Sequence, residues 1–210
     1  MSAKTPGRFI TVEGIDGAGK SSHIEWLREY LTAAGKSVVV TREPGGTPLG
    51  ESLRAILLND PMSPETEMLL MFAARAEHLT SVIRPALEKG AWVISDRFSD
   101  ATYAYQVGGR GVPESKFVAL ESWVQEGLQP DRTLLFDVSV ETAQARLHDT
   151  RILDRFEREA GEFHQRVRNA YHQRAAHYSE RIRLVASDVP MDEVRKQILV
   201  ALEGLLDNDD

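Results

Sequence analysis

The 210-residue sequence has no cysteine, few aromatic residues and no long apolar run. Without cysteine there is no disulfide framework, no thiolate nucleophile and no cysteine-ligated zinc site. No segment approaches the roughly 20 consecutive apolar residues of a membrane-spanning helix. Residues 1–8 have neither the apolar core of a signal peptide nor the pattern of a transit peptide. We therefore expect a cytoplasmic protein with no membrane partner.

Positive charge is in the minority, since the formal net charge is −7 at pH 7. Nucleic acids and anionic membranes are bound by basic surfaces, so we expect no nucleic-acid partner. A small anionic ligand is compatible with this charge, because a local basic cluster can bind it whatever the total. With 42% hydrophobic and 27% charged residues, the composition is that of a globular protein. The length suits a single domain over residues 1–210.

Five short runs of β-branched and apolar residues alternate with helical patterns along the chain. The runs are residues 9–13, 37–42, 92–96, 133–137 and 183–186. Such alternation predicts an α/β fold, a five-stranded parallel sheet flanked by helices on both faces. Three helical stripes are expected to face the core: Ile24, Leu27 and Leu31; Leu69, Phe72, Leu79, Ile83 and Leu87; Val194, Ile198, Leu202 and Leu205.

Two segments interrupt the alternation. Residues 44–50 are rich in glycine and proline and are expected to form a loop. Residues 150–162 are dominated by charge, with Arg151, Asp154, Arg155, Glu157, Arg158, Glu159 and Glu162. A charge run of this kind is commonly a solvated helical face. A lid over a bound ligand is the alternative that the residues alone leave open.

A glycine-rich turn follows the first predicted strand and leads directly into a helix. Its sequence is Gly14-Ile15-Asp16-Gly17-Ala18-Gly19-Lys20-Ser21, a P-loop pattern in the strand–turn–helix context that the motif requires. Glycines let successive N–H groups turn toward phosphates, and the helix N-terminus adds positive partial charge. Lys20 is then expected to bridge the β- and γ-phosphates, and Ser21 to place its hydroxyl on Mg²⁺. We predict that this segment, with Ser22, binds ATP.

A magnesium-side carboxylate should lie at the carboxyl end of a neighbouring buried strand. Asp96 and Asp137 both end a predicted strand. Asp96 is preferred because Arg97 follows it at once, and together they suit a site for a metal and a second phosphate. Asp137 is interpreted as a strand-end or helix-capping carboxylate. No guanine-recognising Asn-Lys-x-Asp follows any predicted strand and the chain is short for a motor, which favours a small kinase.

Four ordered segments make the sequence resemble the thymidylate kinases. They are Thr41-Arg42-Glu43-Pro44-Gly45-Gly46, Phe72-Ala73-Ala74-Arg75, Asp96-Arg97-Phe98, and Tyr105-Gln106 with Gly108-Gly109-Arg110-Gly111. Val107 stands where the family usually has a further glycine. The resemblance implies a P-loop kinase fold with a mobile lid at about residues 150–162, a homodimer, and transfer of the γ-phosphoryl group of ATP to dTMP. The alternatives are a kinase for another nucleoside monophosphate or a deoxynucleoside, and a non-catalytic nucleotide-binding switch.

The resemblance also implies which residues bind dTMP. Arg97 and Arg54 would hold the acceptor phosphate, for which the planar guanidinium is well suited. Glu43 would lie near the sugar and the metal-bound waters, with Pro44 shaping the loop. At the base, stacking and hydrogen bonding would come from Phe72, Arg75 and Gln106. The region of the deoxyribose and the methyl group would be bordered by Thr102 and Tyr103.

Catalysis by this type of enzyme rests on in-line positioning and on positive charge at the migrating phosphoryl group. Some family members carry an arginine inside the P-loop, but positions 15–18 here are Ile-Asp-Gly-Ala. The run from Leu153 to Glu157 resembles the lid of the bacterial type, whose arginine is matched by Arg155, with Arg151 and Arg158 as possible assistants. Asp16 corresponds to an acidic position near the acceptor phosphate. The expected catalytic residues are therefore Lys20, Arg155, Asp16 and Arg97.

Overall fold

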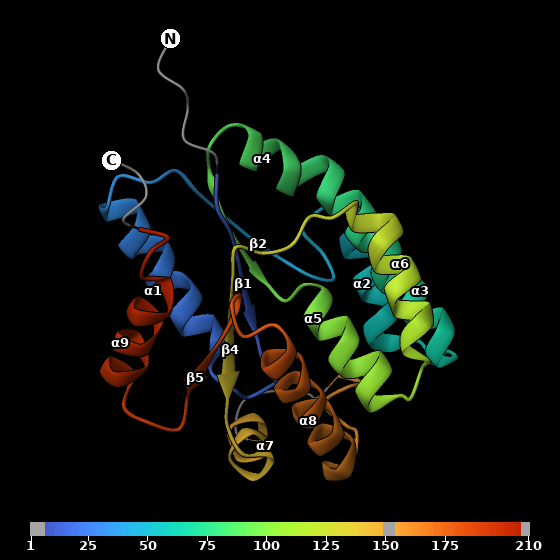
Figure 1. Ribbon diagram of the computed structural model, residues 1–210. Helices are drawn as coiled ribbons and strands as arrows, with labels where there is room; N and C mark the ends of the chain where they lie inside the picture. Colours follow the sequence, from blue (N-terminus) through green and yellow to red (C-terminus); the bar gives the residue numbers. More distant parts are fainter. Residues whose placement is uncertain (1–6, 149–153, 207–210) are drawn as a thin grey trace.

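The computed structural model describes residues 7–148 and 154–206 and is built around one parallel sheet (Figure 1). Its strands are β1 (Phe9–Glu13), β2 (Val38–Arg42), β3 (Trp92–Asp96), β4 (Arg132–Asp137) and β5 (Ile182–Ala186), in the order β2-β3-β1-β4-β5. Neighbouring strands all pair in parallel. The predicted α/β fold is confirmed, and each strand begins within one residue of the predicted start.

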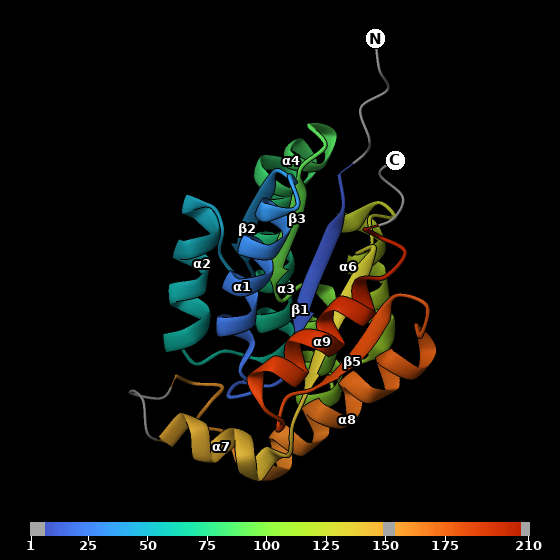
Figure 2. The same ribbon diagram turned by 90° about the vertical axis from the view of Figure 1, so that its left-hand side faces the viewer.

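Helices cover both faces of this sheet. The helical elements are α1 (Lys20–Ala33), α2 (Pro48–Asn59), α3 (Pro64–His78), α4 (Arg84–Glu88), α5 (Ser99–Thr102), α6 (Glu114–Gln125), α7 (Val140–His148), α8 (Gly161–His177) and α9 (Met191–Leu202), with two π-helical segments, η1 (Leu79–Ile83) and η2 (Tyr103–Gly109). Figure 1 shows α1 and α9 on one side of the sheet and α3, α5, α6 and α8 on the other. Figure 2 shows α1 and α9 side by side. None of the described helices has the length and apolar character that crossing a bilayer requires.

The Gly/Pro-rich loop after β2 ends where α2 begins, and local chemistry explains the boundary. The Thr47 hydroxyl accepts a hydrogen bond from the Gly50 N–H at 2.9 Å, and Pro48 occupies the first turn. Helix α3 begins in the same way, with Ser63 as the capping residue and Pro64 after it. A capping hydroxyl followed by proline is a favoured helix start. These two starts fix the helices that carry Arg54 and Arg75.

The predicted core stripes are confirmed except at Leu69, and Leu87 is only partly buried against the core. The stripes on α1 and near the C-terminal end are buried, as are Phe72, Leu79 and Ile83. Leu69, in contrast, is 54% exposed, so its assignment to the core was wrong. The inward face of α3 is set by Met68, Phe72 and Arg75. Leu69 is rotated by one helical position from that face and points outward.

The Gly-rich run after Gln106 brings η2 against α8. A Cβ atom on Gly108 would collide with Ala170, and one on Gly109 would collide with the Phe163 ring. Val107 packs instead against the apolar cluster of Met68, Phe72, Val112 and Phe117. Small residues are therefore required on the α8 side of η2, whereas the opposite side accepts a β-branched residue.

The predicted lid is described only from Asp154 onward. Arg151 and Leu153 lie outside the described residues. The Asp154 carboxylate accepts hydrogen bonds from the N–H groups of Phe156 at 2.8 Å and Glu157 at 3.0 Å, forming a turn before α8. Both side chains are 6% exposed. This part of the segment is therefore a packed turn and not a solvated helical face.

Candidate active site

The P-loop joins the end of β1 to the start of α1. Gly14 and Gly17 have φ angles of 134° and 82°, in the region that favours glycine. A side chain at either position would also meet backbone, at Phe136 or Ala143. The Lys20 ammonium group donates to the carbonyls of Gly14 and Ile15, at 3.0 Å each. Burial and the charge of Arg97 lower the pKa of Lys20.

A cavity opens beside this loop. The predicted nucleotide residues Asp16, Gly17, Gly19, Lys20, Ser21 and Ser22 line it, together with Arg42, Glu43, Arg54, Asp96, Arg97, Arg146 and Leu147. Ile15 and Ala18 bury their side chains in the core. Those two residues can therefore contact a nucleotide only through their main chains.

Asp96 ends β3 next to the P-loop strand, paired in register with Val12 of β1. Its Oδ1 atom is buried and has no hydrogen-bond partner within residues 7–148 and 154–206. Asp137, the alternative strand-end carboxylate, is bound by Arg168 at 2.7 and 2.8 Å and by His172 at 3.0 Å. Of the two carboxylates, Asp96 is thus the one with an oxygen available to a ligand.

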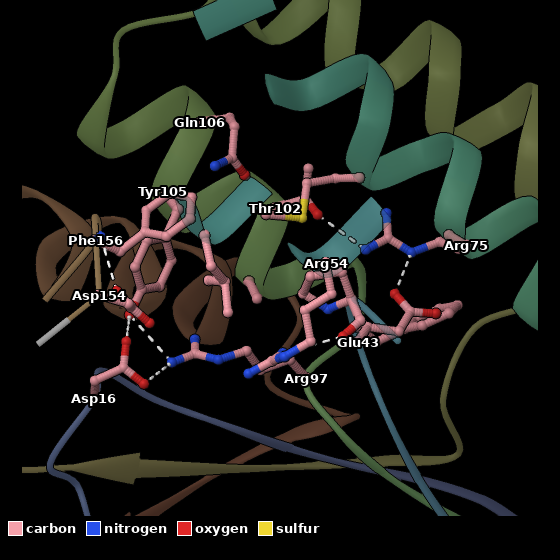
Figure 3. Close-up of a pocket in the computed structure, with 15 residues that line it drawn as sticks. Asp16, Glu43, Arg54, Arg75, Arg97, Thr102, Tyr105, Gln106, Asp154 and Phe156 are labelled. Atoms are coloured by element: carbon pink, nitrogen blue, oxygen red, sulfur yellow. Dashed lines mark hydrogen bonds and ion pairs between the residues drawn. The ribbon is translucent and has the colours of Figure 1, made fainter. Parts of the chain in front are cut away.

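Arg97 links the P-loop to a second pocket (Figure 3). Its guanidinium group donates to Asp16 Oδ1 at 2.7 Å and to the hydroxyls of Tyr105 and Tyr171 at 3.2 Å each. The Tyr105 hydroxyl in turn donates to Asp16 Oδ2 at 3.0 Å. Burial alone would raise the pKa of Asp16, but the charges of Arg97 and Lys20 outweigh it and hold the pKa well below its usual value. Asp16 therefore stays ionised and fixes Arg97.

Glu13 supports Arg97 indirectly, through its neighbour Phe98 and its partner Tyr171. It accepts hydrogen bonds from the Phe98 N–H at 2.7 Å and from the Tyr171 hydroxyl at 2.9 Å. Burial and the nearby charge of Asp100 raise the pKa of Glu13 to about 8. Neither Glu13 nor Tyr171 is predicted from the sequence, because Tyr171 lies 158 positions from Glu13 and no local pattern marks it.

The second pocket lies between the end of the sheet and the helices α2, α3, α5 and η2. Its lining includes Asp16, Glu43, Pro44, Arg54, Met71, Arg75, Arg97, Phe98, Thr102, Tyr105, Gln106, Asp154 and Phe156. Arg54 and Arg97 line this pocket and the P-loop cavity alike. The two guanidinium groups therefore lie between the P-loop cavity and the second pocket, where they could contact a phosphate bound in either one.

Arg75 is almost wholly buried and is held by its neighbours. It donates to Glu43 Oε2 at 2.8 Å and to the Thr102 hydroxyl at 2.9 Å. Its guanidinium group lies between the rings of Phe72 and Phe98, with centroids at 4.7 and 4.9 Å. The remaining nitrogen, NH1, is buried and has no hydrogen-bond partner in the described part of the chain. One donor of this fixed group is therefore left for a ligand.

Gln106 contributes the opposite kind of atom. Its side chain is wholly buried, and its amide nitrogen donates to Glu67 at 2.7 Å. Its carbonyl oxygen, Oε1, finds no partner among the described residues. Figure 3 shows Gln106 and Arg75 approaching the same cavity. The pocket thus presents one donor and one acceptor, both fixed by neighbouring side chains.

Phe72 and Tyr103 are placed differently from the other predicted binding residues. Phe72 is buried beneath Arg75 and packs on Phe117, while Tyr103 packs between Phe117 and Arg174. In the residues that the structure describes, neither lines the second pocket. Direct contact of either side chain with a ligand stays a prediction.

Arg155 contacts the helices α2 and α3. Its guanidinium group donates to the Leu57 carbonyl at 2.9 Å and pairs with Glu67 at 2.6 Å. Arg146 of α7 reaches the P-loop backbone, where it donates to Gly17 O at 3.3 Å, and it also donates to Ser187 O at 3.0 Å. Only the fold identifies Arg146, because in the sequence it is an ordinary charged residue of a helix.

A P-loop cavity joined by Arg97 to a second pocket defines a nucleotide-dependent phosphotransferase with two substrates. The family model "Thymidylate kinase" matches residues 12–198. Thymidylate kinase of Methylobacillus flagellatus is 61% identical over 193 residues, covering 92% of this chain and 95% of the relative. That of Bordetella petrii is 57% identical over 199 residues, covering 95% and 96%. A crystal structure of thymidylate kinase from Ehrlichia chaffeensis is similar with a TM-score of 0.77 and 34% identity, covering 94% of this chain and 99% of that one.

The chain belongs to the thymidylate kinase family. The predicted resemblance is confirmed, and so is the P-loop kinase fold. The protein is therefore an enzyme of nucleotide metabolism that transfers the γ-phosphoryl group of ATP to dTMP, giving dTDP and ADP.

Proposed function

We propose that the P-loop cavity binds ATP, that the second pocket binds dTMP, and that Arg97 and Arg54 hold the acceptor phosphate between them. The observation that carries this assignment is the pair of buried atoms without a partner in the described residues, Arg75 NH1 and Gln106 Oε1. Arg75 and Gln106 line the same pocket, and buried polar atoms are normally bonded.

The two atoms suit one edge of thymine. Thymine presents the acceptor O4 next to the donor N3–H, so Arg75 can donate to O4 while Gln106 accepts from N3–H. Cytosine presents an amino group and a ring acceptor at these places, which reverses both bonds. A buried site that is left unpaired by the wrong base gives strong discrimination. Arg75 and Gln106 therefore select the acceptor.

The transfer itself requires charge and alignment more than covalent chemistry. Lys20 is proposed to contact the β- and γ-phosphates, and Asp16 to keep Arg97 aligned on the acceptor phosphate. Arg155 would have to leave Glu67 to reach the migrating phosphoryl group. The lid, at about residues 150–162, is proposed to close over both substrates and exclude water.

The donor set near the P-loop fits magnesium. Asp96 Oδ1 is buried without a partner in the described ranges, and Ser21 lines the same cavity. Mg²⁺ prefers oxygen ligands and is commonly held by one or two protein groups together with phosphates. In agreement, the described residues contain no cluster of three or more potential protein ligands. We propose that Asp96 and Ser21 hold Mg²⁺, which would neutralise charge on the phosphates of ATP.

We also propose a homodimer and a single domain over residues 1–210. Leu69 on α3 and Val118 and Trp123 on α6 are 54%, 52% and 77% exposed, and α3 packs on α6. Exposed apolar side chains on two helices that pack together suit contact with a second copy. The cytoplasmic location stays a prediction from the sequence.

The experiment that tests the acceptor assignment is coupled ADP release with dTMP, dUMP, dCMP, AMP and thymidine. We expect dTMP to exceed dCMP in kcat/KM by about 10³-fold or more, because both hydrogen bonds are reversed for cytosine. Thymidine should be a poor acceptor, since it offers no phosphate to Arg97 and Arg54. A preference for any acceptor other than dTMP would overturn the assignment.

A further inference from the structure

We propose that Glu67 is a positioning residue for base recognition. It holds the Gln106 amide with its oxygen toward the acceptor base, so that the pocket accepts a ring N–H and rejects a ring nitrogen that lacks hydrogen. The proposal rests on the placement of dTMP in the second pocket. It concerns a residue of α3 that does not line that pocket among the described residues.

Glu67 is a buried carboxylate, 1% exposed, eight residues before Arg75 on α3. Its Oε1 accepts from the Gln106 amide nitrogen at 2.7 Å and from Arg110 at 3.4 Å. Its Oε2 is paired with Arg155 at 2.6 Å. A carboxylate between two guanidinium groups is compensated in charge, and it offers acceptors only.

The acceptor-only character of Glu67 decides the direction of the Gln106 amide. The nitrogen of the amide must face Glu67, because the opposite rotamer would bring two oxygen atoms together without a proton between them. The Gln106 side chain is 0% exposed, so water cannot satisfy a reversed amide. The oxygen is therefore directed away from Glu67, into the pocket that Gln106 lines.

This arrangement explains why Gln106 Oε1 has no partner in the part of the chain that the structure describes. A buried acceptor left unbonded lowers stability, and binding of a ring N–H removes that deficit. An uncharged amide in place of Glu67 would hydrogen-bond with Gln106 in either orientation. The charged carboxylate at position 67 is therefore what makes the pocket select a base with a ring N–H over one whose ring nitrogen lacks hydrogen.

The test is Glu67→Gln, with kcat/KM measured for dTMP and for dCMP. We expect the dTMP-to-dCMP ratio to fall by about tenfold or more, because Gln106 can then present either its oxygen or its nitrogen to the base. Glu67→Asp keeps an acceptor-only group, so its ratio should stay within about threefold of wild type even if both rates fall.

Two controls separate this role from a general loss of structure. Glu65→Gln changes an exposed carboxylate on the same helix, paired at the surface with Lys116, and should leave the ratio unchanged. Arg155→Ala removes one partner of Glu67 and should lower the rate for both acceptors without altering the ratio. Equal losses for dTMP and dCMP in Glu67→Gln would show that Glu67 is merely structural and would overturn the proposal.

The double variant Glu67→Gln with Gln106→Glu provides a test that a folding defect cannot imitate. A carboxylate at position 106 is again acceptor-only and can accept a hydrogen bond from the N–H group of the new amide at position 67. We expect this exchange to restore preference for dTMP, and absence of recovery in a folded double variant counts against the proposal. If wild-type enzyme itself fails to prefer dTMP, the proposed function falls. If only the variant ratio is unchanged, this inference alone falls.

Discussion

The P-loop cavity is the proposed phosphate cradle, and the second pocket is the proposed acceptor pocket. The two share Arg54 and Arg97 but are built in different ways. The loop of the cradle is one continuous segment, from Gly14 to Ser22, at the junction of β1 and α1. The pocket is assembled from side chains of separate elements, among them Glu43, Arg75 and Gln106. Phosphate is common to all nucleotides and suits a backbone cradle, whereas recognition of one base requires side chains fixed by buried partners.

This difference predicts that the two regions fail in different ways when they are altered. Loss of a cradle side chain should stop chemistry and spare recognition of the acceptor. Loss of a buried partner in the pocket should change which acceptor is used. Arg97, bonded to Asp16 and to Tyr105, joins the two regions and is expected to affect both.

The largest expected effect is that of Lys20→Ala. Turnover should fall below detection, because the buried ammonium group at the cradle supplies charge to the phosphates of ATP. Binding of dTMP, measured by calorimetry, should persist. Lys89→Ala, at an exposed position, is the matched control. Loss of dTMP binding in Lys20→Ala would contradict the division between the two regions.

Arg155→Ala is expected to lower kcat by about 10³-fold or more, as does loss of an arginine finger in related chemistry, with a modest change in dTMP affinity. The measurement is steady-state turnover together with dTMP binding. Arg158→Ala removes an exposed arginine three positions further along and should have a much smaller effect. Near-normal turnover of Arg155→Ala would leave Arg155 with a structural role, as a partner of Glu67 and the Leu57 carbonyl.

Asp96→Asn should raise the Mg²⁺ concentration needed for half-maximal activity by about tenfold or more, since a carboxylate ligand is replaced by a weaker amide. The matched control is Asp137→Asn, which alters the other strand-end carboxylate, bound to Arg168 and His172. A magnesium titration of turnover checks both. An equal shift in the two variants would remove Asp96 from the metal site.

Glu13→Gln tests whether the buried Glu13 carboxyl group, which supports both regions, makes the stability of the protein depend on pH. The Glu13 pKa is raised by burial from 4.5 to about 8, so the folded state holds this proton more tightly than the unfolded state. The stabilising contribution is complete below pH 4.5 and is lost as pH rises toward 8. Each pH unit in this window removes at most about 1.4 kcal/mol from the free energy of unfolding.

Urea unfolding of wild type and Glu13→Gln at pH 5.5 and pH 8 measures this contribution. The variant, which has no titrating group at position 13, should lose less stability between the two pH values. Parallel loss in both proteins would mean that Glu13 does not titrate in this range. At pH 7, Glu13→Gln is expected to change kcat less than Lys20→Ala, Arg155→Ala or Asp96→Asn.

Several features of the fold and site follow from local sequence. The strands were predictable because runs of β-branched residues between helical patterns suit buried parallel strands. The P-loop was predictable because its glycines and Lys20 are contiguous, and the strand–turn–helix context is local as well. The family itself was recognisable from ordered segments such as Thr41 to Gly46.

The support of the site was not predictable in the same way. Glu67 lies 39 positions from Gln106, and Tyr171 lies 74 positions from Arg97. Each is an ordinary residue of a helix until packing brings it to its partner. Leu69 shows the same limit in the core. Its place in the sequence pattern predicted burial, but it lies one position away from the buried face of α3 and is exposed.

The sequence by itself therefore determined the order of the strands along the chain, the phosphate cradle and the family, because these depend on residues that are neighbours or follow a regular period. Only the tertiary structure decided how Asp16 fixes Arg97, that Arg155 rests on Glu67, and which atoms of Arg75 and Gln106 have no partner in the described residues. The physical reason is that side-chain direction and burial are set by contacts between distant segments, which composition and periodicity do not specify.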